Sequence, residues 1–517
     1  HLAGDRFNEA AAAFELAFKT DSSFWFAYWR YAYARGWHER SVDSSVHAAY
    51  WQHRAQFPER DRLLIEARDS AAWNPSQPTS GLSGHVARLR AITERFPDYW
   101  PAWLQYQDQL VHNAALLGGS YADSRAALER LIVLNPDLVP AWIHLFWIAV
   151  YQRDSVATSR ILGELRRLKY DSTSIREGGL SEYGHYQYLH QLVRSSGGTL
   201  GSTQAGQIAA RLVGYRGSIP ADALAGGGFA LYEFHAAQID LARRMLQQAP
   251  PPDLAALQWH ALAQAWAGRG AWDSAMVAED RYYTTAPGSV PAIEGYGLAA
   301  VGSWLGAVDT TTVGRWSERV QASAVRLAPE DQAEVAWLDG IAALARLDRS
   351  AMQRARRTLA SLDTWSAPHL SRSLAAFELE LTGDRRSAAD SLARLEIELA
   401  ESFAFRRLSL SHPYVASVDR LAAGRWLTGA REYARAAALL SWYEMVLPVQ
   451  YFRSARNSRM LAGLAAFERA KLHEAWGRGA VARDFYRRFL EVYDTPVAAH
   501  RWMMQAAQAS LRASSDR

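Results

Sequence analysis

The stretch AALQWHALAQAWAGRGAWDSAMVAEDRYYTTAP, residues 255–287, has the spacing of a helical hairpin. Trp259, Leu262 and Trp266 recur at steps of three and four residues, which places them on one face of a first helix. Two glycines then end that helix, and a second amphipathic segment runs to Pro287, where proline stops it. Because one hairpin cannot bury its apolar face alone, this stretch predicts a stack of hairpins along the chain.

A second pair of segments gives the repeat length in the N-terminal half. The sequence FPDYWPAW at 96–103 recurs as NPDLVPAW at 135–142. Trp103 and Trp142 are 39 residues apart, and so are the prolines that follow the first residue of each segment. Two markers with the same period indicate a structural repeat with a loop insertion, which we place at 116–121.

The order of residues in 255–287 resembles the tetratricopeptide repeat (TPR): Trp, Leu, a small residue, an aromatic, Gly, Ala and a closing Pro over 34 positions. Ile293 also follows Trp259 by 34 residues. This resemblance implies an all-α, TPR-like α-solenoid, a superhelix of helical hairpins with about 25 helices and no strands. It also implies that Trp259 is buried between its hairpin and the next.

Glycine clusters divide the chain into three regions. We predict an N-terminal TPR block at 1–169, an irregular helical joint at 170–249, and a C-terminal TPR block with a capping helix at 250–517. The joint contains Gly-Gly or Gly-Gly-Gly at three places, where the hairpin pattern weakens. Since the chain begins at His1 rather than methionine, we expect it to be processed or part of a longer polypeptide.

Composition excludes several classes of function. The chain has 517 residues, 49% of them hydrophobic, with 20 Trp and a formal net charge of only +4. Acidic residues are interspersed with the arginines, so we predict no nucleic-acid-binding stripe. The absence of cysteine excludes disulfides and thiolate metal sites and leaves the cellular compartment open. No apolar run reaches the roughly 18 residues of a membrane span, so we expect no membrane insertion by this segment.

No catalytic set is apparent in the sequence. His185 and His190 are five residues apart, which does not place both imidazoles on one helical face as an i, i+4 pair would. The triple glycine at 226–228 has no accompanying nucleophile elbow. The carboxylates Glu378 and Glu380 lie among arginines on a predicted helix, an arrangement typical of solvated ion pairs. We therefore predict no catalytic residue, no metal site and no cofactor.

Three segments resemble the C-terminal TPR region of bacterial serine/threonine protein kinases. They are FPERDRLLIEARD at 57–69, the paired units from 96 to 142, and LHEAWGRGAVARDFYRRFLEVY at 472–493. The kinase itself is absent, because the chain contains no Gly-rich loop entering a strand, no VAIK-type lysine, and no HRD or DFG motif. The resemblance implies a regulatory or sensory region whose catalytic domain would precede His1.

Partner binding is expected on the concave face of the superhelix. In each hairpin, the residue after the predicted packing position and those four and eight further on form an adjoining stripe. Aromatic residues on such a stripe suit a groove for an extended or helical peptide, and the alternative is that they pack against neighbouring repeats. The candidate groove residues are Trp29, Tyr33, Trp37, Asp108, His112, Trp147, Tyr151, His260 and Gln264.

Helical phase separates these two alternatives. If the groove is real, Trp29, Tyr33, Trp147 and Tyr151 should be partly exposed to solvent. The preceding residues Tyr28 and Trp142 should be buried at the packing positions. The exposure of six side chains therefore decides between groove and core: Tyr28, Trp29, Tyr33, Trp142, Trp147 and Tyr151.

Three functions remain open from the sequence. The first is a non-catalytic scaffold that binds a protein or peptide, as the tail of a bacterial kinase, a free-standing TPR adaptor or the TPR tail of a transcriptional regulator. The second is an enzyme with its site in the joint at 170–249. The third is a structural spacer or oligomerisation arm. The sequence upstream of His1 would distinguish most cheaply between them.

Overall fold

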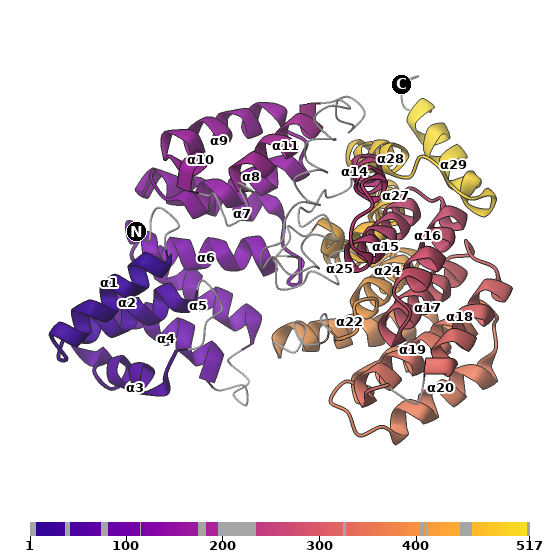
Figure 1. Cartoon of the computed structure of the whole chain (residues 1–517), viewed down its shortest axis with the longest axis horizontal. Helices are drawn as coiled ribbons and strands as arrows, with labels where there is room; N and C mark the ends of the chain where they lie inside the picture. The colour runs from indigo at the N-terminus through magenta and orange to yellow at the C-terminus, as the bar shows by residue number, and fades with distance from the viewer. Residues whose placement is uncertain are drawn as a thin grey trace. The chain divides into compact units, whose positions relative to one another are not determined.

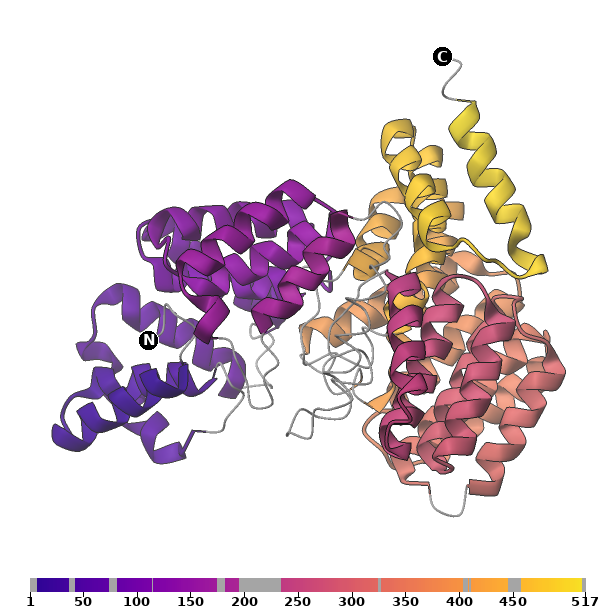
Figure 2. The ribbon, with the colours of Figure 1, turned by 45° about the horizontal axis from the view of Figure 1, so that its top comes forward.

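The computed structural model shows two compact units built of helices (Figures 1 and 2). It describes residues 7–36, 42–73, 81–113, 115–173, 182–194, 234–323, 327–402, 408, 411–444 and 457–513. The first unit comprises residues 1–114, 119–190 and 401–403, and the second comprises residues 115–118, 191–400 and 404–517. Within the described ranges there is no strand, so the predicted all-α fold is confirmed. In these ranges no helix has both the length and the apolarity needed to cross a membrane.

The first unit is a row of helical hairpins in which successive helices pack on one another from α1 to α3 and from α4 to α10, with a 3-10 turn between α3 and α4 that contacts both. The helices are α1 (Phe7–Thr20), α2 (Trp25–Gly36), α3 (Ser44–Gln52), α4 (Glu59–Trp73), α5 (Leu82–Arg95), α6 (Trp100–Asn113), α7 (Tyr121–Leu134), α8 (Val139–Tyr151), α9 (Ser155–Arg167), α10 (Tyr170–Thr173) and α11 (Glu182–Arg194), with a 3-10 turn at Arg54–Gln56. Of the helical joint predicted at 170–249, α11 therefore forms as a helix, whereas residues 195–233 lie outside the described part.

The second unit has the two-row packing of a solenoid. Here α17 contacts both its partner α18 and the next first helix α19, and α19 likewise contacts α20 and α21. The helices are α14 (His235–Gln247), α15 (Pro252–Gly268), α16 (Trp272–Thr285), α17 (Ser289–Trp304), α18 (Thr310–Ser323), α19 (Pro329–Ala345), α20 (Arg349–Ser361), α21 (Ala367–Leu381), α22 (Arg385–Glu401), α24 (Val415–Gly429), α25 (Tyr433–Leu440), α27 (Ala462–Ala475), α28 (Gly479–Val492) and α29 (Arg501–Arg512), with 3-10 turns at Ser441–Glu444 and Ala498–His500. First helices meeting first helices make this unit a TPR-like α-solenoid.

The same turn joins the two helices of most hairpins. At each one a residue with positive φ follows the first helix, and the next N–H bonds to the carbonyl five residues earlier, the 6→1 bond of a Schellman motif. In the hairpin of α15 and α16, predicted at 255–287 and called the anchor hairpin below, this residue is Gly270 (φ 88°), and Ala271 N–H donates to the Trp266 carbonyl. The positive-φ residues at equivalent turns are Arg153, Gly306, Leu347, Gly383, Arg431 and Gly477.

The repeat predicted at 96–142 appears as one hydrogen-bond pattern used twice. The indole N–H of Trp103 donates to the carbonyl of Pro97 at 3.1 Å, and that of Trp142 donates to the carbonyl of Pro136 at 2.8 Å. Both tryptophans thereby fasten the first turn of their helix to the loop before it. The 39-residue period of the sequence is therefore also a period of the structure. The predicted insertion is the loop before α7, which opens with a capping box made by Ser120 and Asp123.

The anchor hairpin forms α15 and α16 as predicted, but its tryptophans are not at the core. Leu262 and Ala263 are buried, whereas Trp259 and Trp266 are only half-buried, so the expected burial of Trp259 is wrong. The reason is that α15 packs between α14 and α16 and also reaches Asn457, just before α27, so the residues on either side of Trp259 in the sequence, Gln258 and His260, are the buried ones. Trp266 instead lies under the guanidinium of Arg269, 5.4 Å from its ring centre.

A C-terminal clasp, residues 493–500, joins the end of the second unit to its beginning. Thr495 N–H and Val497 N–H donate to the carbonyls of Arg269 and Gly270, each at 3.0 Å. The Arg269 guanidinium also makes two bonds, of 2.7 and 2.6 Å, to the Asp494 carboxylate. A Cβ on Gly270 would lie 2.7 Å from the Tyr493 ring, so this turn needs glycine for space as well as for its positive φ.

Buried side chains complete the clasp in an ordered chain of donors. The Trp272 indole N–H donates to the Tyr493 hydroxyl at 3.1 Å, and that hydroxyl lies 2.7 Å from Nδ1 of His500. Nε2 of His500 lies 2.8 Å from the Leu305 carbonyl, which can only accept. Burial lowers the pKa of His500, so its neutral ring donates from Nε2 and accepts at Nδ1. Each group in this series of hydrogen bonds therefore has a partner, and the series links the C-terminal clasp to α16 and to the end of α17.

Candidate functional site

The predicted aromatic stripe on α2 lies in the core. Trp29 and Tyr33 are 0% and 1% exposed, while Tyr28, predicted to be buried, is half-exposed and stacks on Phe18 of α1. The predicted phase is therefore wrong for this hairpin. The cause is that α2 is covered on two sides, by α1 and by α3, and the Trp29 ring packs against Tyr50 of α3. These two aromatics stabilise the fold and present no groove surface.

The corresponding stripe on α8 has one half-buried aromatic residue, Trp147, and one buried one, Tyr151. Trp142 is buried as expected, and Trp147 is half-buried with its ring edge-on to Tyr186 of α11, 5.2 Å between centroids. Tyr151 is only 9% exposed and packs on Tyr121 of α7, so its expected exposure is wrong. The neighbouring hairpins cover the end of this stripe. Trp37, the remaining aromatic candidate, lies outside the described residues.

The polar candidates of the first unit come together with a histidine from the next hairpin. Asp108 and His112, one turn apart on α6, have their Oδ1 and Nε2 atoms 3.4 Å apart, and both side chains are 18% exposed. His144 of α8 brings its ring edge-on to that of His112, with 5.0 Å between centroids. One donor atom from each of the three residues lies within 4.8 Å of the other two. His144 was not among the predicted site residues, because it lies on a different helix from the other two.

Electrostatics sets the charge state of this cluster. Burial, reinforced by the neighbouring His112, lowers the pKa of His144 to about 3, so its imidazole is neutral at pH 7. Burial acts to raise the pKa of Asp108, but the two imidazoles and Arg68 outweigh it and hold that pKa below its ordinary value. The cluster therefore holds a carboxylate and a neutral imidazole side by side, two groups that act as metal ligands.

The polar candidates of the second unit form an internal network. His260 and Gln264 are 4% and 7% exposed, so their expected position on an open groove is wrong. Nδ1 of His260 lies 3.0 Å from the Glu279 carboxylate, and the Gln264 amide lies 3.0 Å from Nε2 of the same ring. Gln264 also reaches Asn457, just before α27. Contacts with Glu279 of α16 and with Asn457 therefore place this predicted concave stripe in the interior of the unit.

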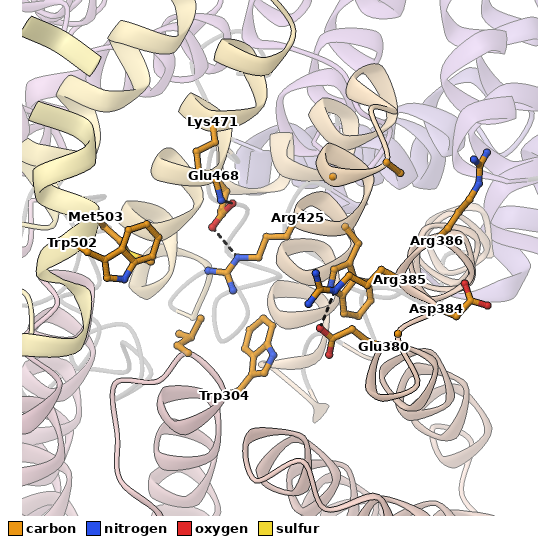
Figure 3. Close-up of a pocket in the computed structure, with 15 residues that line it drawn as sticks. Trp304, Glu380, Asp384, Arg385, Arg386, Arg425, Glu468, Lys471, Trp502 and Met503 are labelled. Atoms are coloured by element: carbon orange, nitrogen blue, oxygen red, sulfur yellow. Dashed lines mark hydrogen bonds and ion pairs between the residues drawn. The ribbon is translucent and has the colours of Figure 1, made fainter. Parts of the chain in front are cut away.

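An open pocket of about 850 Å³ lies in the second unit where several hairpin ends converge (Figure 3). It is lined by residues from α17, the α21–α22 turn, α24, α27 and α29. Apolar lining comes from Trp304, Leu305, Trp426, Trp502 and Met503, and charged lining from Glu380, Asp384, Arg385, Arg386, Arg425, Glu468 and Lys471. Of its tryptophans, Trp502 is 53% exposed, unusual for so large an apolar side chain.

The arginine at the centre of the pocket is held in place on several sides. In Figure 3, Arg425 lies between Trp304 and Glu468. Its Nε donates to the Glu468 carboxylate at 3.0 Å, and its guanidinium is 5.6 Å from the Trp304 ring centre. Lys471 binds the other oxygen of Glu468 at 3.0 Å, and these two cations outweigh burial and lower the pKa of Glu468. Glu468 is therefore ionised and fully engaged.

The rim of the pocket carries the less constrained charges. Arg385 and Arg386 have side chains 70% and 73% exposed, with ion pairs of 3.6 Å to Glu380 and 3.3 Å to Glu432. Asp384 caps α22 through the Ser387 N–H at 3.1 Å. Exposed ion pairs contribute little and exchange readily, so the two arginines are available to an anionic ligand. This pocket could not be predicted from the sequence, because its lining comes from five separated segments.

The comparisons with known proteins do not assign a family. No protein-family description matches the chain, and no curated protein matches it. Among solved structures, the crystal structure of the yeast Tom70 is similar, with a TM-score of 0.32 and 12% sequence identity over 88% of this chain and 97% of that chain. The hairpins, their turns and their packing define the fold by themselves.

Proposed function

We propose that the chain is a non-catalytic helical-repeat scaffold that binds a peptide segment of a partner protein in the pocket of the second unit. The observation that carries the proposal is the combination of the exposed Trp502 with the exposed Arg385 and Arg386 around one concavity. Tryptophan and arginine are the residues most enriched at interface positions that dominate binding free energy.

The charges indicate which peptide fits. Four cationic side chains and three carboxylates line the pocket, and each carboxylate already has a partner: Glu468 binds Arg425, Glu380 pairs with Arg385, and Asp384 caps α22. The surplus is positive and lies at the rim. An extended peptide with an acidic residue beside an aromatic or large aliphatic one would pair with the arginines and pack on Trp502.

A displayed library of random peptides tests this chemistry. Peptides selected on the full chain should pair an acidic residue with an apolar one. The double substitution Arg385→Glu and Arg386→Glu should weaken their binding by about tenfold or more, which corresponds to about 1.4 kcal/mol. Trp502→Ala should cost about 2 kcal/mol of binding free energy. Fluorescence anisotropy of labelled peptides measures both.

Arg487→Glu is the matched control, because Arg487 lies on α28 with its side chain 62% exposed and does not line the pocket. It should leave peptide affinity unchanged. Two outcomes would contradict the proposal. The selected peptides could bind the double variant and the wild type equally, or the selection could recover no peptides that pair an acidic residue with an apolar one.

For the wider context, we propose that this scaffold is the regulatory or sensory C-terminal region of a bacterial serine/threonine kinase. The support is the resemblance of segments 57–69, 96–142 and 472–493 to such tails. Reading the coding sequence upstream of His1 tests it, since a kinase domain is expected there. A transcription-regulator domain or a start codon would favour the other two scaffolds. The enzyme alternative places its site at 170–249, of which residues 174–181 and 195–233 lie outside the described part.

A further inference from the structure

The cluster Asp108–His112–His144 in the first unit has the composition of a metal site. Two imidazoles and one carboxylate present donor atoms within 4.8 Å of one another, which is close enough for one ion to contact all three. The set is the only one of its kind in the part of the chain that the structure describes. Neither the peptide pocket nor the repeat packing explains why these three groups meet.

The fold brings the three donors together by simple geometry. Asp108 and His112 are at i and i+4 of α6, so their side chains lie one above the other on one face. His144 lies in the middle of α8, the first helix of the next hairpin, and its ring meets the His112 ring edge-on. A helix pair that presents an i, i+4 pair to a third ligand is a rigid support for a metal ion.

A neighbouring glutamine sets the tautomer of His144. The Gln107 amide nitrogen donates to the Leu104 carbonyl at 3.1 Å, so its Oε1 faces His144 Nδ1 at 2.9 Å and must accept. Nδ1 therefore carries the proton, and the lone pair is on Nε2. Gln107 is fully buried, so the arrangement is fixed. Metal-binding histidines are held in this way, with one ring nitrogen donating to a second acceptor.

The other two groups still have bonding capacity. Nδ1 of His112 is buried and has no hydrogen-bond partner among the described residues. The nearest contact of Asp108 Oδ1 to His112 is 3.4 Å, long for a charge-assisted hydrogen bond, and Gln109 reaches only Oδ2. A buried polar cluster with unused donors and acceptors costs free energy unless a further group completes it.

We propose that Asp108, His112 and His144 bind one divalent transition-metal ion, with Zn²⁺ the preferred ion. Imidazole and carboxylate ligands suit zinc, and three protein ligands leave a fourth position for water or for a donor from a bound partner. The positive charge of Arg68 acts on Asp108 and lowers the affinity. The affinity should accordingly be weaker than that of closed four-ligand zinc sites.

The test uses the full chain and Zn²⁺ alone. After equilibrium dialysis, metal analysis should give one bound Zn²⁺ per chain, and Zn²⁺ should raise the melting temperature as any ligand of the native state does. Asp108→Asn, His112→Gln and His144→Gln should each lose both effects. With Co²⁺ in place of Zn²⁺, the visible bands of a four- or five-coordinate ion should appear in the wild type and be absent from the variants.

His53→Gln is the matched control, since His53 is a histidine of the same unit that packs on Trp25 outside the cluster. It should keep the bound Zn²⁺ and the visible bands. Circular dichroism verifies the fold of each variant, and the nearly isosteric Asp108→Asn provides the decisive comparison if a histidine variant unfolds. Equal Zn²⁺ binding by wild type and Asp108→Asn, or no bound ion in the wild type, would overturn the proposal.

Discussion

Trp272→Ala is expected to lower the free energy of unfolding of the second unit by about 3–5 kcal/mol, the range for truncating a core tryptophan. Trp272 is 0% exposed and packs against Gly302 of α17, where a Cβ would lie 2.8 Å from the indole. Its N–H also begins the donor chain through Tyr493 to His500. The substitution therefore opens a cavity and releases the clasp together.

Hydrogen exchange locates this effect, and denaturant unfolding measures it. Protection should fall in residues 255–305 and in the clasp at 493–500, while the first unit keeps its protection, because a repeat stack opens at its weakest interface. Trp502→Ala is the matched control, since it removes the same side chain from an exposed position and should cost much less. Unchanged exchange in the clasp would show that Trp272 does not hold it.

Arg420→Met is expected to cost a similar amount, about 3–5 kcal/mol, because it leaves a buried charge without its partner. Arg420 and Glu396 are 1% and 0% exposed, and the Arg420 Nε donates to the Glu396 carboxylate at 2.7 Å. Replacing both residues, Arg420→Met with Glu396→Leu, should recover most of the loss, since hydrophobic residues of similar volume can replace a buried pair. Chemical unfolding of both variants and the wild type checks the result. A double variant no more stable than Arg420→Met would contradict this account.

The adjacent Asp419 gives this region a pH dependence of known sign. Burial, reinforced by the charge of Glu396, raises the pKa of Asp419 well above its ordinary value. The native state then holds a proton that the unfolded state has released, so this carboxyl makes stability fall as pH rises above about 4. Asp419→Asn keeps the acceptor for the Ser373 hydroxyl, 2.8 Å away, without the titrating proton.

Stability measured from pH 4 to pH 7 should therefore decline less in Asp419→Asn than in the wild type. Asp484→Asn is the control, because Asp484 lies on α28 with its side chain 73% exposed. It should leave the pH profile unchanged. A wild-type profile that the Asp419 substitution leaves unaltered would show that this carboxyl is ionised in both states.

Local signals in the sequence predicted the hairpins well. Glycine and proline positions marked the ends of α15 and α16, and the 39-residue period between Trp103 and Trp142 reappeared as the same indole-to-carbonyl hydrogen bond. These signals succeed because caps, turns and helical periodicity depend on residues close together in the chain. The regions 1–169, 170–249 and 250–517 remain a prediction.

Which residues face the core could not be read from a single helix. Trp29 and Tyr33 lie one residue after the predicted packing position and are buried, while Trp259 occupies that position and is half-buried. A helix inside a solenoid has neighbours on more than one side, so an apolar stripe shows that a face is covered without showing by which element. The expected aromatic groove failed for this reason.

The sequence by itself determined a stack of helical hairpins, the turns between them and the residues available to pack. Tertiary structure alone decided that the clasp closes the second unit and that Trp502, Arg385 and Arg386 share one pocket. It also decided that His144 completes a cluster begun by Asp108 and His112. The physical reason is that a helix orders its side chains by local periodicity, whereas these sites join side chains from helices whose spacing and rotation are set by packing.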